Sequence, residues 1–164
     1  MRRQTRLMGL AAAVAVLAPL APVTAGTAAG QAGGTFVPFN QVLRRCDFSE
    51  TDFNGPTGYA RATAVVHRTG SEVSADIEMN TAIPNIHYDV RLIQMPRPAS
   101  ATCHGGDPGV TAAPIFIDAA GAGRVTLRDA IEPNATGVWV FITRPDRFSQ
   151  NPAEFYTSDF VAPV

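Results

Sequence analysis

The sequence predicts an all-β protein: a single immunoglobulin-like antiparallel β-sandwich of about seven strands, preceded by a cleavable signal helix. Three observations lead to this expectation. Apolar and polar residues alternate with a period of two in several segments. Turns rich in Gly, Pro and Asn separate these segments at about 8–12-residue spacing. Outside the N-terminal apolar run, no window carries the apolar i, i+3, i+4, i+7 pattern of a helix over three turns.

The N-terminus has the three parts of a secretory signal peptide. Three arginines lie within the first six residues, and 7–20 carry no charge. Small residues then lead to Ala25, so 1–25 is predicted to be the signal, with cleavage after Ala25 or, as a second choice, after Ala29. The apolar run is shorter than the roughly 20 residues that a spanning helix needs. We therefore expect no membrane anchor in the mature form.

Export sets the expectations for the rest of the chain. Residues 26–35 are small and uncharged and predict a flexible linker, followed by a β-sandwich domain over 36–164. The predicted location is secreted or cell-envelope. Cys46 and Cys103 are the two cysteines, and in an oxidising compartment such a pair predicts a disulfide. The formal net charge of −1 becomes more negative once the signal's arginines are removed, which argues against a nucleic-acid partner.

The domain divides into short strands joined by turns. The predicted strands cover 59–68, 72–80, 86–94, 115–117, 124–131, 137–143 and 154–162. The clearest is 72–80, in which Val73, Ala75, Ile77 and Met79 share one face and polar residues the other. Pro84 and Asn85 supply turn chemistry, so 72–80 and 86–94 are expected to form a hairpin.

Two loops and one helical turn complete the expected layout. With 59–68, the hairpin of 72–80 and 86–94 would make a three-stranded meander. A long Pro- and Gly-rich loop covers 95–110, and a shorter loop covers 145–152. One helical turn is allowed at 39–45, and Cys46 is expected to precede the first strand.

Several local motifs occur together in 36–164. They are AIPNIHYDVRL at 82–92, a cysteine after a Pro-rich gap, DAAGAG at 118–123, GVWVFI at 137–142 and EFYTSDF at 154–160. In these motifs the chain resembles small uncharacterised exported proteins of mycobacteria and related actinobacteria. The resemblance implies an extracytoplasmic β fold and carries no function.

Four residues are candidates for a copper or zinc site: His87, Asp89, His104 and Asp107. His87 and Asp89 share the outer face of one predicted strand, and the other two lie in the long loop that follows. Such sites need at least two or three converging imidazoles. The alternative, which the pattern favours, is that His87 and Asp89 face solvent and pair across the hairpin with Glu78 or Asp76.

The strand at 137–143 is apolar on both faces. Val138, Val140 and Ile142 share one face, while Trp139 and Phe141 share the other. Either the strand is covered on both sides, or Trp139 and Phe141 form an exposed binding patch. Burial is favoured, because the loop 95–110 must pack against some part of the sheet.

The chain contains no catalytic or cofactor motif. It has no G-x-S-x-G elbow, although three histidines leave a hydrolase formally open. The sequence therefore predicts an exported, non-enzymatic binding or envelope-associated module, with no cofactor and with a protein or envelope component as partner. The first alternative is a copper- or zinc-binding secreted domain that uses His87, Asp89, His104 and Asp107. The second is a secreted hydrolase.

Overall fold

The computed structural model describes residues 33–53 and 58–164. The predicted signal peptide (1–25) and most of the predicted linker (26–35) lie outside the described residues. Within these ranges the chain is all-β and contains no helix, as the periodicity predicts. The described residues form no helix that is long and apolar enough to cross a membrane.

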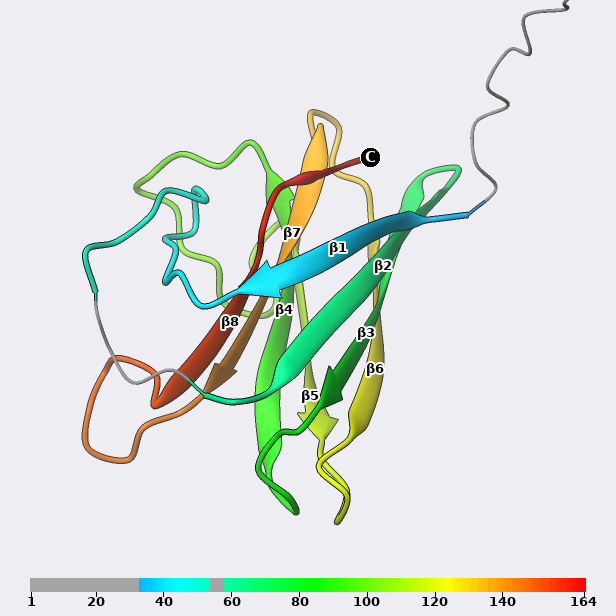
Figure 1. Cartoon of the computed structure of the whole chain (residues 1–164). Helices are drawn as coiled ribbons and strands as arrows, with labels where there is room; N and C mark the ends of the chain where they lie inside the picture. Colours follow the sequence, from blue (N-terminus) through cyan, green and yellow to red (C-terminus); the bar gives the residue numbers. More distant parts are fainter. Residues whose placement is uncertain (1–32, 54–57) are drawn as a thin grey trace, which may run out of the picture. The chain divides into compact units, whose positions relative to one another are not determined.

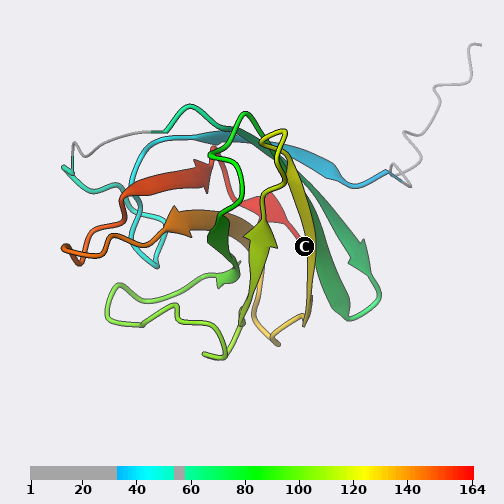
Figure 2. The ribbon, with the colours of Figure 1, turned by 90° about the horizontal axis from the view of Figure 1, so that it is seen from below.

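In the described part of the chain, nine strands form one antiparallel sheet that is nearly closed into a barrel (Figures 1 and 2). The strands are β1 (Thr35–Asn40), β2 (Arg61–Thr69), β3 (Glu72–Asn80), β4 (His87–Met95), β5 (Val110–Phe116), β6 (Gly123–Ala130), β7 (Gly137–Arg144), β8 (Glu154–Ser158) and β9 (Ala162–Pro163). Their order in the sheet is β5-β4-β7-β8-β1-β2-β3-β6, and β9 also pairs with β7.

Strand β1 joins the two halves of this sheet. Its first part, from Thr35 to Pro38, pairs with β2, whereas Phe39 and Asn40 pair with β8. One half therefore contains β1, β2, β3 and β6, and the other contains β5, β4, β7, β8 and β9. Figure 2 shows the strands curving around a common interior.

The predicted hairpin between 72–80 and 86–94 is wrong, and so is the three-stranded meander. Strand β3 does pair with β2, but its other neighbour is β6, and β4 pairs with β5 and β7. The connection between β3 and β4 crosses from one half of the sheet to the other. Thr81 and Asn85 both have positive φ there, and Asn85 donates its N–H to the carbonyl of Ile117 in the β5–β6 connection. The inner faces of β3 and β4 thus meet across the core instead of pairing edge to edge.

Because β3 and β4 do not form a hairpin, His87 and Asp89 do not have the ion-pair partners that the sequence predicted. Asp76 lies 3.3 Å from His67 Nε2 on β2 and accepts a hydrogen bond from Thr126 on β6. Glu78 pairs with Arg124 on β6. His87 and Asp89 lie in the other half of the sheet, so they do not pair with Asp76 or Glu78.

Several other predicted features also differ from the structure. Residues 36–40 belong to β1, a strand that precedes Cys46, and no helical turn forms at 39–45. Strand β1 was missed because a proline within a run argues against a strand and only Val37 is buried in it, so alternation is weak. Strand β5 begins at Val110, which shortens the long loop, and the last predicted strand is divided into β8 and β9.

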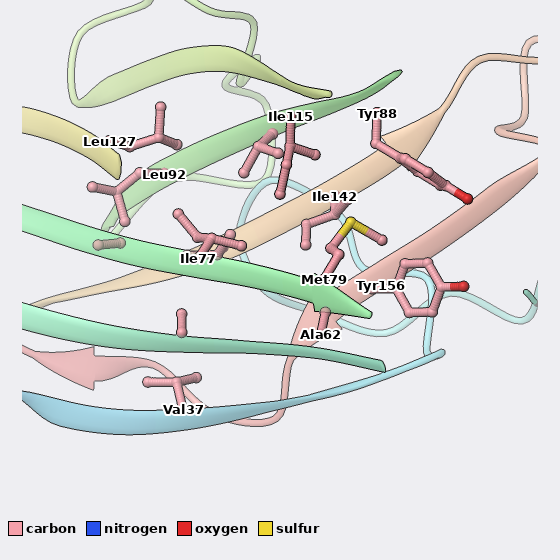
Figure 3. Packing of buried hydrophobic residues seen from close by; sticks show 14 of the residues in the cluster. Val37, Ala62, Ile77, Met79, Tyr88, Leu92, Ile115, Leu127, Ile142 and Tyr156 are labelled. Atoms are coloured by element: carbon pink, nitrogen blue, oxygen red, sulfur yellow. The ribbon is translucent and has the colours of Figure 1, made fainter. Parts of the chain in front are cut away.

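The main core fills the space between the two halves of the sheet. Figure 3 shows Ile77 and Met79 of β3, Leu92 of β4 and Ile142 of β7 within it. The face assigned to 72–80 from its alternation is confirmed, since Val73, Ala75, Ile77 and Met79 are all buried. Tyr88, Val90 and Leu92 of β4 are buried as well, and they alternate with His87 and Asp89, which the sequence placed on the outer face of this strand.

Candidate binding groove

The outer face of β4 and β7 carries a second apolar cluster. Its buried members are Ile93, Cys103, Val110, Trp139, Phe141 and Phe155. Residues directly opposite each other in antiparallel strands share a face. The register sets Ile93 between Val110 of β5 and Trp139 of β7, so these three side chains form a continuous apolar surface.

Two irregular segments cover this surface. Residues 41–53 place Leu43, Phe48 and Phe53 on the cluster, and residues 96–109 add Cys103. The Phe48 ring meets the Trp139 ring edge to face at 5.4 Å. The predicted disulfide between Cys46 and Cys103 is confirmed, and it links the two covering segments to each other.

Trp139 and Phe141 are therefore not an exposed patch. Only 1% of the Trp139 surface and 7% of the Phe141 surface is accessible. Of the two interpretations that the sequence allowed, the covered strand is the one found in the structure.

The cover ends at Arg91, and the same sheet face is open from Arg91 toward the start of β4. Arg91 lies opposite Ala112 of β5 and Phe141 of β7, and Asp89 lies opposite Pro114 and Thr143. Two cavities, of about 420 and 360 Å³, adjoin here and share Arg91 and Thr143 in their walls. We call the two together the Arg91 groove.

Different segments line the two parts of the groove. The larger cavity is bounded by Asp89, Ala112 and Pro114 from the sheet and by His104 from the covering segment 96–109. The smaller is bounded by Leu43 and Arg44 on one side and by Asp146 and Asn151 of the β7–β8 connection on the other. The groove thus combines a rigid sheet floor with rims formed by three loops.

Arg91 occupies the boundary between the covered and the open parts of this face. Its guanidinium carbon lies 4.5 Å from the centre of the Phe141 ring, a cation–π geometry. Its Nη1 donates a hydrogen bond of 3.2 Å to the carbonyl of Cys103. Burial lowers the pKa of Arg91 and the negative charge of Asp89 opposes this effect, but the guanidinium remains charged at neutral pH.

No known protein family, curated protein or solved structure matches this chain. The assignment of a function therefore depends on the geometry of the groove itself.

The structure brings together only some of the predicted metal-site residues. Asp89 and His104 line the same cavity. His87 Nε2 lies 3.9 Å from Asp89 Oδ1, and the His87 ring packs 6.0 Å from the ring of Phe116. The Asp107 carboxylate accepts hydrogen bonds from the Thr102 hydroxyl and the His104 N–H within its own loop. These hydrogen bonds lower the pKa of Asp107. Over 33–53 and 58–164, no three His, Cys, Asp or Glu side chains are grouped so that they could hold a metal ion.

A second polar cluster lies inside the barrel, around the buried carboxylate of Glu154. Tyr88 and Tyr156 each donate a hydroxyl hydrogen bond to Glu154, and Arg144 Nε donates another at 3.1 Å. Figure 3 shows the two tyrosines with their hydroxyls directed toward the same end of the core. The Tyr156 hydroxyl also accepts the N–H of Ala60 and borders a cavity of about 400 Å³. Because these groups already hydrogen-bond one another, the cluster joins β4, β7, β8 and residue 60 and leaves no free carboxylate for a ligand.

Arg91 and Glu154 were not identified from the sequence. Arg91 lies within the predicted strand 86–94, and Glu154 lies at the start of the last predicted strand. No local pattern distinguishes either residue, because their surroundings come from strands far away along the chain. Only the register of β4 with β7 sets Arg91 over Phe141.

Proposed function

We propose that this chain is an exported, non-enzymatic binding module that holds its ligand in the Arg91 groove. One observation carries the proposal: the disulfide-linked cover stops halfway along the β4–β7 face. Beyond it, a partly buried arginine is shared by two adjoining cavities. Binding sites are typically concave and mainly apolar, with a few polar groups that orient the ligand.

The surroundings of the groove favour binding over catalysis. The polar side chains of its larger cavity are Asp89, Arg91, His104 and Thr143, and the smaller cavity adds Arg44, Thr51, Asp146, Ser149, Gln150 and Asn151. His104 is exposed, and its backbone N–H bonds to Asp107. Acyl-transfer chemistry requires a base that is hydrogen-bonded to a nucleophile. The described residues of the groove contain no such pair.

The compartment forms part of the same proposal. A buried disulfide is consistent with an extracytoplasmic location, because such bonds persist in oxidising compartments. We retain export through 1–25 and the narrower immunoglobulin-like sandwich description as parts of this proposal.

An NMR fragment screen tests the proposed function. Isotope-labelled protein is mixed with a library of small neutral and charged fragments, and amide shift changes are mapped onto the structure. We expect saturable changes concentrated at Asp89, Arg91, Ala112 and Thr143. Fragment binding concentrated at the cavity beside Tyr59 and Tyr156, or at no common place, would contradict the proposal.

A further inference from the structure

The Arg91 guanidinium has hydrogen-bonding capacity that the protein does not use. Arginine carries five N–H donors in a planar fork. Among the described residues, Cys103 is the one hydrogen-bond partner found for this side chain, and it engages Nη1 alone. No carboxylate of the described chain lies within 4.0 Å of Arg91 as an ion-pair partner.

On this basis, and resting on the proposed function, we infer that the Arg91 groove binds a ligand through a carboxylate group. Arginine matches a carboxylate with two parallel N–H···O bonds, and such charge-assisted pairs are among the strongest hydrogen bonds in proteins. Phe141 lies against the guanidinium, so it holds the fork in one orientation. An incoming carboxylate would meet a donor pair that is already placed and would lose little conformational entropy in binding it.

The charges around the groove favour a monoanion. Asp89 lines the larger cavity and Asp146 the smaller, so the groove has carboxylates on both sides of Arg91, while the other cation in its wall, Arg44, is already paired with Glu50. Asp89 is near enough to oppose the lowering of the Arg91 pKa by burial. A phosphate dianion would meet greater repulsion from these two groups than a carboxylate would. Asp89 can instead accept a hydrogen bond from an N–H or O–H beside the ligand's carboxylate.

The floor of the groove suits the carbon skeleton of such a ligand. Ala112 and Pro114 of β5 are exposed there and present only small apolar groups. The terminal carboxylate of a peptide, with its neighbouring amide N–H, has the required chemistry. A sugar acid, with hydroxyls beside its carboxylate, has it too.

Paired small molecules test this inference by NMR titration. The probes are N-acetylalanine, its neutral primary amide, glucuronate and inorganic phosphate. We expect N-acetylalanine or glucuronate to shift Arg91 and Thr143 saturably, with the amide and phosphate at least tenfold weaker. The stronger of the two carboxylates identifies a peptide terminus or a sugar acid as the source.

Two matched arginine variants complete the experiment. Arg91→Lys keeps the charge but removes the fork, so carboxylate affinity should fall at least tenfold. Arg61→Lys alters an exposed arginine on β2, in the other half of the sheet, and should change affinity less than twofold. Unchanged Trp139 fluorescence in Arg91→Lys establishes that the cover is intact.

The results that would contradict the carboxylate inference differ from those that would contradict the proposed binding function. Equal binding of N-acetylalanine and its amide at the groove, or tighter binding of phosphate, would overturn the carboxylate inference and leave the binding function standing. An unchanged affinity in Arg91→Lys would also overturn the inference. If neither the fragments nor these probes bind at the groove, the proposed function itself fails.

Discussion

At the residue scale, Glu154 shows how a charged group is accommodated in the interior of this protein. It is 2% exposed, and three donors surround its carboxylate: the hydroxyls of Tyr88 and Tyr156 and the Nε of Arg144. A buried charge that keeps its hydrogen bonds is tolerated, whereas one that loses a partner is costly. The same contacts disfavour the ionised form of each tyrosine.

Alkaline pH should therefore destabilise the fold. Burial, together with the hydrogen bond to Glu154 and its charge, raises the pKa of Tyr88 from 10.0 to about 12. The pKa of Tyr156 is raised for the same reasons. A folded-state pKa above the unfolded value means that the unfolded chain releases its proton first as pH rises. The stabilisation is complete below about pH 10 and is lost as pH rises through about 12.

Urea denaturation between pH 8 and pH 12 measures this loss. Wild type should lose unfolding free energy steeply above pH 10. Tyr88→Phe should be less stable at pH 8, because Glu154 loses a donor, but its free energy should fall less steeply above pH 10. Identical slopes for the two proteins would show that Tyr88 ionisation is not coupled to folding.

At the scale of elements, the disulfide-linked cover determines what the β4–β7 face can do. The segments 41–53 and 96–109 contain no long strand of their own, yet they bury Trp139, Phe141 and Phe155. The Cys103 carbonyl also holds Arg91, so the cover and the groove share one contact. The disulfide is thus expected to support both the apolar cluster and the binding site.

Removing the disulfide should open the cover while the strands persist. Bridging residues 57 apart restricts the unfolded chain by about 4 kcal/mol in the entropy model, so Cys46→Ser/Cys103→Ser should lose roughly that much stability. Trp139 is the single tryptophan, and its emission should shift to the red as Phe48 leaves it. Far-UV circular dichroism should change little, because neither cysteine lies in a strand.

The double-serine variant should also bind N-acetylalanine more weakly than wild type. Oxidised wild type in the same buffer is the reference. Trp139 emission identical to that reference would mean that packing alone holds the cover in place.

At the scale of the whole described domain, the two halves of the sheet share one core. Ile77 and Met79 come from one half and Leu92 and Ile142 from the other, and all four are at most 1% exposed. Strand β1 also pairs with both halves. Neither half can bury its inner face alone, so we expect a single cooperative unfolding transition.

Truncating the shared core should lower stability without dividing the transition. Leu92→Ala should cost about 2–5 kcal/mol, since it leaves a cavity between the halves. Phe116→Ala, at a residue that is 71% exposed, should change stability by less than about 0.5 kcal/mol. Trp139 fluorescence and far-UV circular dichroism should give coincident urea curves for both variants. Separate midpoints for the two signals would contradict a common core.

Features within a single strand were predictable from the sequence. The bounds of β3 were predicted to the residue, and those of β4 and β6 to within one residue at each end. The alternation along 72–80 also identified the buried side chains. The disulfide followed from having two cysteines in a chain that the sequence predicts to be exported. Strand β1 was not predictable, because its Pro38 and partly exposed side chains hide the period of two.

The sequence by itself determined that the described domain is all-β, which face of β3 and β4 is buried, and that Cys46 and Cys103 pair. Only the tertiary structure decided that β3 and β4 meet across the core, that the cover lies over Trp139, and that Arg91 lies over Phe141 at the edge of an open groove. The physical reason is the range of the interactions. The period of two assigns each side chain to a face from its neighbours in sequence. The choice of partner strand depends instead on packing and hydrogen bonds between residues far apart in the chain, and the local pattern carries no record of these.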